Sequence, residues 1–360
     1  MSLNSTAFIL LRLALGTSKE LPNPIPDTEW QSLYSLMKNM RLGGIAFTAI
    51  ESLPKVLLPP RKLMMEWYLH TELIIKKNQL INSEAVRLTR LFEEDDIRTV
   101  IMKGPANARL YPDPMRRNTG DIDIWVEGGR DFVINYLRQK GIKTWNHLDY
   151  HHVQLKRNSK GVIVEVHFRP SSGNYNPITN RRVQKYLGKE LDGPHDSYEG
   201  FNVPSKQFDL VMQLAHIQRH FLGGDVSMRQ LVDYFYLLQS STDEERHEVS
   251  AQLHRLGLKS IGGAVMWILV HVMYLDEKLI LTDMDEKRGR WMLDDAVNMK
   301  NDIDIKGSTL KQLLKEEKRR LKMMGFAPSE MFVMDMQWWK YIAKTLPLRI
   351  GKRSARIQNS

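Results

Sequence analysis

Hydrophobic side chains recur at helical spacing through most of the first hundred residues. The spacing predicts one helix within residues 28–53 and a second from about Pro60 to Ile81, with proline in its first turn. Ser83 is a suitable N-cap for a third helix with an apolar stripe. Residues 1–82 are therefore expected to form an N-terminal helical region.

The pattern changes to short alternating strands and helices between residues 83 and 200. Strands are predicted at 99–102, 121–127, 151–156 and 161–168, and short helices at about 104–111 and 131–140. The last two strands flank a polar turn and should form a hairpin. This stretch is expected to be the α/β core of the protein.

The remaining chain returns to helical spacing. Helices are expected over Met228–Leu238, Val265–Leu275 and the aromatic segment Met331–Ile342. Residues 201–345 would form a C-terminal helical domain, and residues 346–360 a basic tail. The predicted fold class is α+β, a small mixed β-sheet embedded in N- and C-terminal helical regions.

Two acidic residues occupy one face of the predicted strand 121–127. Residues i and i+2 of a strand point the same way, so Asp121 and Asp123 project together, opposite Ile122 and Ile124. Such carboxylates repel each other unless a cation or an arginine compensates them. Mg²⁺ suits this place because it binds one or two carboxylates and leaves room for substrate phosphates. A solvated strand face is the alternative reading of the doublet alone.

A third acid lies in the predicted strand 161–168. Glu165 and His167 share the face opposite a row of valines, and an isolated acid there indicates a specific role. His167 could orient Glu165 or contact a nucleotide, and a histidine that only shapes the strand is equally compatible. The sequence leaves these roles open.

The composition changes this picture only a little. The 360 residues include no cysteine, which excludes disulfides and thiolate metal sites, and 52 basic against 42 acidic residues give a net charge of +10. The positive charge favours anionic partners such as nucleotides or nucleic acid. We recognise no export signal and no apolar run long enough to span a bilayer, so a cytoplasmic protein without membrane contact is expected.

Several short motifs together resemble a known family. They are Lys103-Gly104, Leu110-Tyr111-Pro112, Arg117, Gly120-Asp121-Ile122-Asp123 and Glu165-Val166-His167, and the segment Arg229–Asp233 is similar to the family as well. The chain resembles the uncharacterised branch of the polymerase-β-type nucleotidyltransferases over about residues 30–240. It departs from most of them in the Lys-Gly pair, where a Gly-Ser pair is usual.

The resemblance implies an enzyme that transfers a nucleoside monophosphate from an NTP, such as ATP, to an acceptor hydroxyl and releases pyrophosphate. Asp121, Asp123 and Glu165 would be its catalytic and metal-binding residues, with Mg²⁺ or Mn²⁺ as cofactor in a two-metal site. Asp121 and Asp123 would hold the nucleotide-bound ion. Glu165 would share the second metal or accept the proton of the attacking hydroxyl.

Substrate binding is expected from Lys103, Gly104, Arg117, Gly120 and His167. Lys103 and Gly104 suit a triphosphate, because glycine allows close backbone approach and the lysine adds positive charge. A plain strand-to-helix turn with a surface lysine is the alternative. Arg117 either binds phosphate or compensates the acids, for which an ion pair to Asp121 would suffice.

Other candidates have ordinary explanations. His216 and His220 have zinc-pair spacing, but Ile217 stands where a metalloprotease helix needs glutamate, so these histidines should line the groove or pack between helices. Arg229 and Asp233 should form a helix ion pair or a cleft wall. Trp338-Trp339 could stack bases or belong to the core, and the tail cations could bind an anion.

Two rival functions remain open at this stage. The same site could transfer the γ-phosphoryl group, as a kinase does, or the protein could be a catalytically silent relative that binds RNA or protein. The acceptor, whether nucleic acid, protein or small molecule, and the oligomeric state cannot be read from the sequence.

Overall fold

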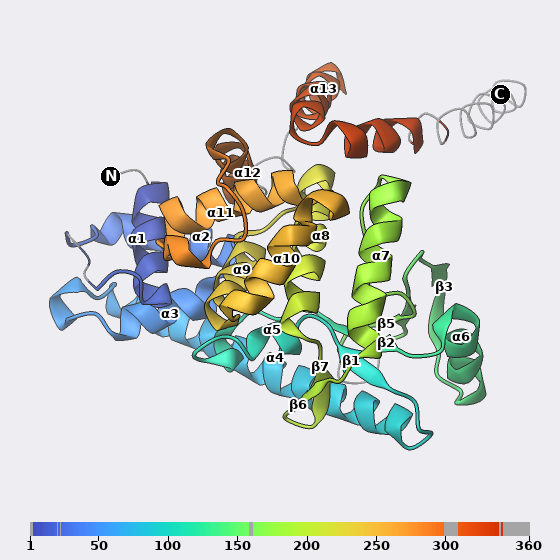
Figure 1. The fold of residues 1–360 in the computed structure, drawn as a ribbon. Coiled ribbons are helices and arrows are strands. Elements are labelled where there is room, and N and C mark those ends of the chain that lie inside the picture. Colours follow the sequence, from blue (N-terminus) through green and yellow to red (C-terminus); the bar gives the residue numbers. More distant parts are fainter. Residues whose placement is uncertain are drawn as a thin grey trace, which may run out of the picture.

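A five-stranded mixed sheet surrounded by helices forms the centre of the protein in a computed structural model (Figure 1), which describes residues 3–19, 21, 23–157, 161–298, 309–337 and 340. The strands are β1 (Thr99–Ile101), β2 (Ile122–Val126), β3 (Thr144–Leu148), β4 (His152–Leu155) and β5 (Val164–His167). Their order is β1-β2-β5-β4-β3. β2 and β5 run parallel, and the other neighbours are antiparallel. The predicted α+β class with a small mixed sheet is therefore confirmed.

One face of this sheet is hydrophobic. Ile122, Ile124 and Val126 of β2 join the valines of β5 in a buried cluster, which is completed by α4 (Arg61–Glu93) and α6 (Gly129–Gln139). The opposite face carries Asp123, Glu165 and His167, as the alternation along both strands predicts. Burial of the apolar face fixes the register, and so it fixes the direction of the acids.

Helix α4 differs from the prediction of two helices divided at Ser83. It is one helix of 33 residues, and the Ser83 hydroxyl donates to the Leu80 carbonyl instead of capping a new helix. The sequence between Arg61 and Glu93 contains neither glycine nor proline, so nothing ends the helix there.

The segment 28–53 differs in the opposite sense, because two helices replace one. α2 (Asp27–Asn39) and α3 (Gly43–Glu51) are separated at Arg41, which adopts a left-handed φ of 60°. An added Cβ on Gly44 would lie 2.4 Å from the Arg116 carbonyl oxygen, so this turn approaches the core closely. The break places Arg41 at the edge of the site described below.

The N-terminal and C-terminal helices share one large hydrophobic cluster. α1 (Leu3–Leu15) is joined to α11 (Lys259–Met273) by Arg12, whose Nε donates to the Val272 carbonyl over 2.7 Å. α1 packs against α11, which in turn packs against α12 (Figure 1). The division into an N-terminal region, a core and a C-terminal domain stays a prediction.

The remaining elements are seven helices, three short 3₁₀ helices and a small second sheet among the described residues. The helices are α5 (Pro105–Ala108), α7 (Pro177–Asp192), α8 (Lys206–Gly223), α9 (Met228–Ser240), α10 (Asp243–Leu256), α12 (Glu286–Asn298) and α13 (Thr309–Phe326). Short 3₁₀ helices are η1 (Lys55–Leu57), η2 (Pro114–Arg116) and η3 (Glu277–Leu279). A second sheet pairs β6 (Asp196–Tyr198) with β7 (Phe201–Val203).

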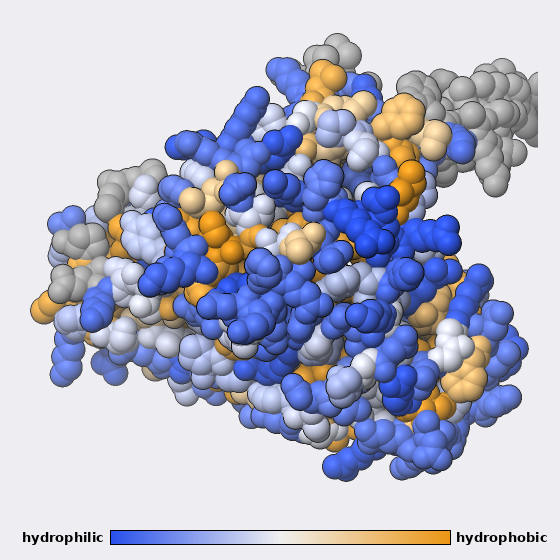
Figure 2. Space-filling model, in the orientation of Figure 1, coloured by the Kyte–Doolittle hydropathy of each residue, from blue (hydrophilic) through white to orange (hydrophobic). Residues whose placement is uncertain are grey.

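Hydrophilic residues dominate the visible surface of the protein (Figure 2). The face in Figure 2 is mostly hydrophilic, with hydrophobic residues in small separate groups. None of the described helices has both the length and the apolar character needed to cross a membrane. Trp338, Trp339 and the basic tail 346–360, which the sequence offered as possible binding elements, lie outside the described residues.

Candidate active site

The turn between β1 and α5 brings Lys103 and Gly104 against the acidic strand. The Met102 amide donates to the Asp123 carbonyl over 2.9 Å, which extends the pairing of β1 with β2 to the end of the turn. Gly104 has φ 58° and ψ −111°, a conformation that glycine adopts at little cost. A Cβ there would lie 2.6 Å from the Asp121 carbonyl oxygen. Gly104 is therefore required for close approach of the turn to Asp121.

Replacing Gly104 with alanine should displace this turn and the segment that carries Asp121. The positive φ and the backbone contact both oppose a Cβ, and backbone strain of this kind costs about 1–3 kcal/mol. We expect a lower unfolding midpoint, measured by thermal unfolding of the variant beside wild type. Gly120, where a Cβ meets nothing within 4 Å, is the matched control for folding. Equal midpoints for Gly104→Ala and Gly120→Ala would contradict this account.

The parallel pairing of β2 with β5 aligns the predicted acids. Asp123 is the register partner of Glu165, and Asp121 immediately precedes β2 on the same side. One ligand atom from each of Asp123, Glu165 and His167 lies within 4.8 Å of the others. The structure thus brings Asp123 beside Glu165 on a neighbouring strand, as the family resemblance implied.

Asp123 is buried and strongly compensated. Lys103 Nζ lies 2.6 Å from its Oδ1, and His167 Nε2 lies 2.9 Å from the same oxygen. Burial opposes its ionisation, but the Lys103 ammonium and the hydrogen bond to His167 outweigh burial and hold the pKa of Asp123 below its ordinary value. Neither contact uses Oδ2. Asp123 is therefore an ionised carboxylate with one oxygen left for a cation.

Asp121 has the opposite electrostatic environment. Burial and the neighbouring Asp123 raise its pKa, and no hydrogen bond or ion pair reaches its side chain from the described part of the chain. Repulsion of this kind is relieved by a divalent cation between the two carboxylates. Carboxylate oxygens are the ligands that Mg²⁺ and Mn²⁺ prefer, so these residues fit such an ion by their chemistry. Among the described residues, the acid-containing group whose ligand atoms lie within 4.8 Å of one another is Asp123, Glu165 and His167, and Asp121 lies outside it.

His167 supports the carboxylates. Burial disfavours its protonation, but the contacts to Asp123 and Glu165 prevail and raise the pKa of His167. Its Nε2 lies 3.6 Å from Glu165 Oε2, and its buried Nδ1 has no hydrogen-bond partner in the described structure. His167 therefore holds Asp123 in place more closely than Glu165, the carboxylate that the sequence analysis expected it to orient.

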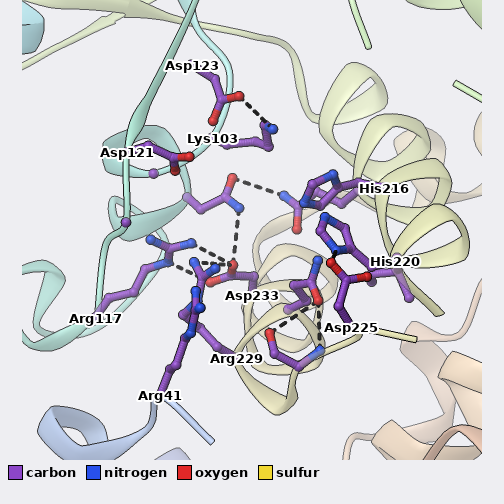
Figure 3. Close-up of a pocket in the computed structure, with 17 residues that line it drawn as sticks. Arg41, Lys103, Arg117, Asp121, Asp123, His216, His220, Asp225, Arg229 and Asp233 are labelled. Atoms are coloured by element: carbon purple, nitrogen blue, oxygen red, sulfur yellow. Dashed lines mark hydrogen bonds and ion pairs between the residues drawn. The ribbon is translucent and has the colours of Figure 1, made fainter. Parts of the chain in front are cut away.

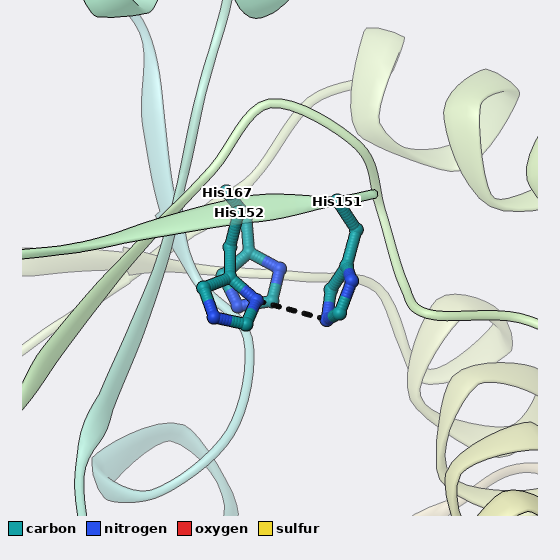
Figure 4. Close-up of side chains that lie close together, drawn as sticks. All are labelled: His151, His152 and His167. Carbon is teal, nitrogen blue, oxygen red and sulfur yellow. Dashed lines mark hydrogen bonds between the residues drawn. The ribbon is translucent and has the colours of Figure 1, made fainter. Parts of the chain in front are cut away.

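Two further histidines, which the sequence analysis did not select, gather beside His167 (Figure 4). His152 is the direct register partner of His167 on β4, and His151 Nε2 lies 3.0 Å from His152 Nδ1. Burial and the other two imidazoles lower the pKa of His151 to about 2, so it is neutral at physiological pH. Ligand nitrogens of the three rings lie within 4.8 Å of one another. Such a group could also hold a transition-metal ion.

Arg117 has a different partner from the one expected. Its Nε and Nη2 donate to Asp233 of α9, each over 2.7 Å, and the pair is almost completely buried. Tyr111 and Asn107 add hydrogen bonds to the same carboxylate, at 2.5 and 3.3 Å. The ion pair to Asp121 is absent from the described contacts. Direct contact of Arg117 with substrate stays a prediction.

The wall opposite the sheet comes from α8. His216 and His220 stack edge to face, with ring centroids 4.2 Å apart, and both line the cleft (Figure 3). Burial and the nearby Lys103 hold the pKa of His216 well below its usual value. Neither histidine belongs to a group of potential metal ligands among the described residues. Their predicted place in the groove is confirmed.

Two adjoining cavities open at the acidic strand. The smaller, of about 240 Å³, extends from Asp121 toward Arg41, Arg117 and Arg229. The larger, of about 550 Å³, contains Glu165 and Tyr175. Both cavities are lined by Lys103, Asp121, His216, His220 and Asp225. A substrate at Asp121 can therefore extend in two directions.

Comparison with known proteins supports the family resemblance. A family model described as "Uncharacterised nucleotidyltransferase" matches residues 26–274, well over half of the chain. No curated protein sequence gives a significant match. A crystal structure of an antigenic nucleotidyltransferase-like protein from Paracoccidioides brasiliensis is similar over 58% of this chain and 96% of that chain, at 14% identity and a TM-score of 0.36. On the family match, the chain belongs to this family of uncharacterised nucleotidyltransferases.

Proposed function

We propose that the protein transfers a nucleoside monophosphate from an NTP to an acceptor hydroxyl in a reaction that requires Mg²⁺ or Mn²⁺. The observation that carries the proposal is the alignment of Asp123 with Glu165 on parallel strands, with Asp121 one residue before β2. These three acids and their cation-compatible charge are what a two-metal phosphoryl-transfer site needs. Membership of the family supports nucleotidyl transfer in general.

In this proposal the acceptor hydroxyl approaches the α-phosphorus from the side of Glu165. Its oxygen forms a bond to the α-phosphorus as its proton passes to the Glu165 carboxylate. The bond between the α-phosphorus and the oxygen that bridges to the β-phosphorus breaks, and pyrophosphate leaves with the electron pair. Divalent ions at the three carboxylates would stabilise the negative charge on the attacking and leaving oxygens.

The chain's own cations orient this chemistry. Lys103 and His167 both contact Oδ1 of Asp123, so they keep that carboxylate ionised and fix its orientation. Lys103 also lines both cavities, where its ammonium can contact a phosphate oxygen. Helix α8 forms the opposite wall of the site, and a substrate that displaces water from the cavities would strengthen each of these electrostatic contacts.

The first test is thermal unfolding of the protein with each NTP, in the presence of Mg²⁺, Mn²⁺ or EDTA. A ligand at 100 times its dissociation constant adds about 2.7 kcal/mol to stability, so one NTP should raise the midpoint in a metal-dependent way. Transfer assays with the same NTP labelled at the α- or the γ-phosphate then identify the group that moves. Label from the γ-position in the acceptor, or no midpoint shift with any NTP, would contradict the proposal.

A further inference from the structure

Arg229 is a poorly compensated cation in the wall of the smaller cavity. Its side chain is 15% exposed, and its buried Nε has no hydrogen-bond partner in the described structure. The nearest carboxylate in a described ion pair is Asp233, at 3.9 Å from Nη1. The sequence analysis expected these two residues to form a helix ion pair or a cleft wall. Both line the smaller cavity, and their ion pair is present at this long distance.

Asp233 is already used by other donors. It accepts two hydrogen bonds from Arg117 and one each from Tyr111 and Asn107. A carboxylate has about four acceptor positions, so these four bonds occupy its capacity. The Arg117–Asp233 pair is neutral as a unit. Arg229 therefore has no carboxylate to itself in the described structure: it shares Asp233 with Arg117, and the other acid that interacts with it, Asp121, lines the same cavity.

The position of Arg229 is electrostatically unfavourable without an anion. It lies in the first turn of α9, where the helix dipole disfavours a cation. Burial and the nearby Arg117 lower its pKa, which means that both oppose its charge. Arg41 and Lys77 add positive charge in its vicinity. An anion in the cavity would compensate all three cations.

The two cavities are lined by different kinds of side chain, so they suit different ligands. The smaller one contains no phenylalanine, tyrosine or tryptophan among its described residues, and Ile217 is its one aliphatic side chain there. It therefore suits phosphate better than a base or an apolar acceptor. The larger cavity contains Glu165, as well as Tyr175 with the Arg219 guanidinium 4.3 Å from its ring centroid.

We propose that the smaller cavity binds the β- and γ-phosphates of the NTP through Arg229 and Arg41, and that the acceptor enters through the larger one. This inference rests on the proposed function and assigns a direction to it. Arginine suits the role because its planar guanidinium donates two parallel hydrogen bonds to phosphate oxygens. When the bond between the α-phosphorus and its bridging oxygen breaks, pyrophosphate leaves with the electron pair on the side of Arg229.

Tripolyphosphate is the probe, because it supplies the anion without a base. Its dissociation constant is measured by calorimetry for wild type, Arg229→Gln and Arg41→Gln at constant ionic strength. Removing a charge-assisted contact should weaken binding about 10- to 100-fold in Arg229→Gln. Arg90→Gln is the matched control, since Arg90 is exposed on α4 and lines neither cavity. It has the same change in net charge and should bind as wild type does.

A stability readout separates anion binding from a structural role. Without anion, Arg229→Gln should unfold at the wild-type temperature or above, because a poorly compensated buried charge has been removed. Tripolyphosphate affinity equal to that of wild type, or no binding to wild type, would overturn the proposal. Arg229-dependent binding without nucleotide transfer would retain this subsite and refute the transferase. Nucleotide transfer with an unchanged KM for NTP in Arg229→Gln would retain the transferase and refute this subsite.

Discussion

Replacing Asp121 with asparagine is expected to remove nucleotide transfer while the protein stays folded. Asp121 has no described side-chain partner, so the amide leaves no broken ion pair behind. The amide cannot supply the negative charge that holds a divalent ion. Loss of a metal ligand should cost about 4 kcal/mol of transition-state stabilisation, which is about 10³-fold in rate.

The same substitution should leave stability unchanged or raise it at neutral pH. Burial and Asp123 raise the pKa of Asp121 in the folded protein. A raised folded pKa contributes stability that is present below the unfolded pKa of about 4 and is lost as pH rises through the folded pKa. Wild type therefore carries this penalty at pH 7 without metal. The advantage of Asp121→Asn should vanish as the pH falls below 4.

Turnover and unfolding midpoints of both proteins, each with and without Mg²⁺, test the two expectations together. Glu127→Gln is the matched control, because Glu127 follows β2 and pairs with Arg98 at the surface. It should keep wild-type turnover and the stabilisation by metal and nucleotide. Turnover of Asp121→Asn above one tenth of wild type would refute the metal-ligand role of Asp121.

The sequence predicted the acidic face because that face depends on local rules. Alternation along a strand directs Asp121 and Asp123 to one side and Glu165 to the corresponding side of its own strand. The hydrophobic residues between them must face the core, so the acids cannot point into the core and must lie on the opposite face. The site's three acids were therefore accessible from periodicity together with the family resemblance.

Contacts between distant segments were not accessible in this way. Arg117 and Asp233 are 116 residues apart, and nothing in either local pattern indicates that they pair. The sequence analysis considered a phosphate or Asp121 as the partner of Arg117, because Asp121 lies within the same motif. The chain's path around α5 and α9 decides the pairing, and this path depends on the packing of the whole helical layer.

The histidine cluster and α4 show two other limits. His151 and His152 are neighbours in sequence, so alternation alone would direct them to opposite faces, but β4 begins only at His152. The recurrence of His across the hairpin, at 151, 152 and 167, was the one available signal. At Ser83, a possible cap did not end α4, because tertiary packing continues the helix.

Breaking the Arg117–Asp233 pair is expected to give the largest loss of stability. The side chains are 1% and 4% exposed, and removing one partner of a buried pair costs about 3–5 kcal/mol because the other charge is left without compensation. The pair also joins α9 to the segment that precedes Asp121. Arg117 Nη1 donates to Thr119 over 3.2 Å, and Asn78 donates to the Arg117 carbonyl over 2.7 Å.

The two single variants should not be equivalent. Asp233→Asn leaves both Arg117 and Arg229 without a carboxylate, whereas Arg117→Gln leaves Asp233 with Arg229 only 3.9 Å away. The loss should therefore be greater for Asp233→Asn. Arg117 and Arg229 keep the pKa of Asp233 low against its burial, so its contribution is present above the unfolded pKa and is lost as pH falls through the folded pKa. The difference between wild type and Asp233→Asn should accordingly shrink below pH 4.

Urea unfolding of the two single variants and of the double variant Arg117→Met/Asp233→Leu measures these losses of stability. The double variant removes both charges and should recover much of the loss. Arg98→Gln breaks the exposed pair with Glu127 and should cost at most about 1 kcal/mol. Equal losses for Arg117→Gln and Asp233→Asn would show that Arg229 does not approach Asp233 when Arg117 is removed. Losses near that of Arg98→Gln would show that this buried pair does not hold α9 to the segment that precedes Asp121.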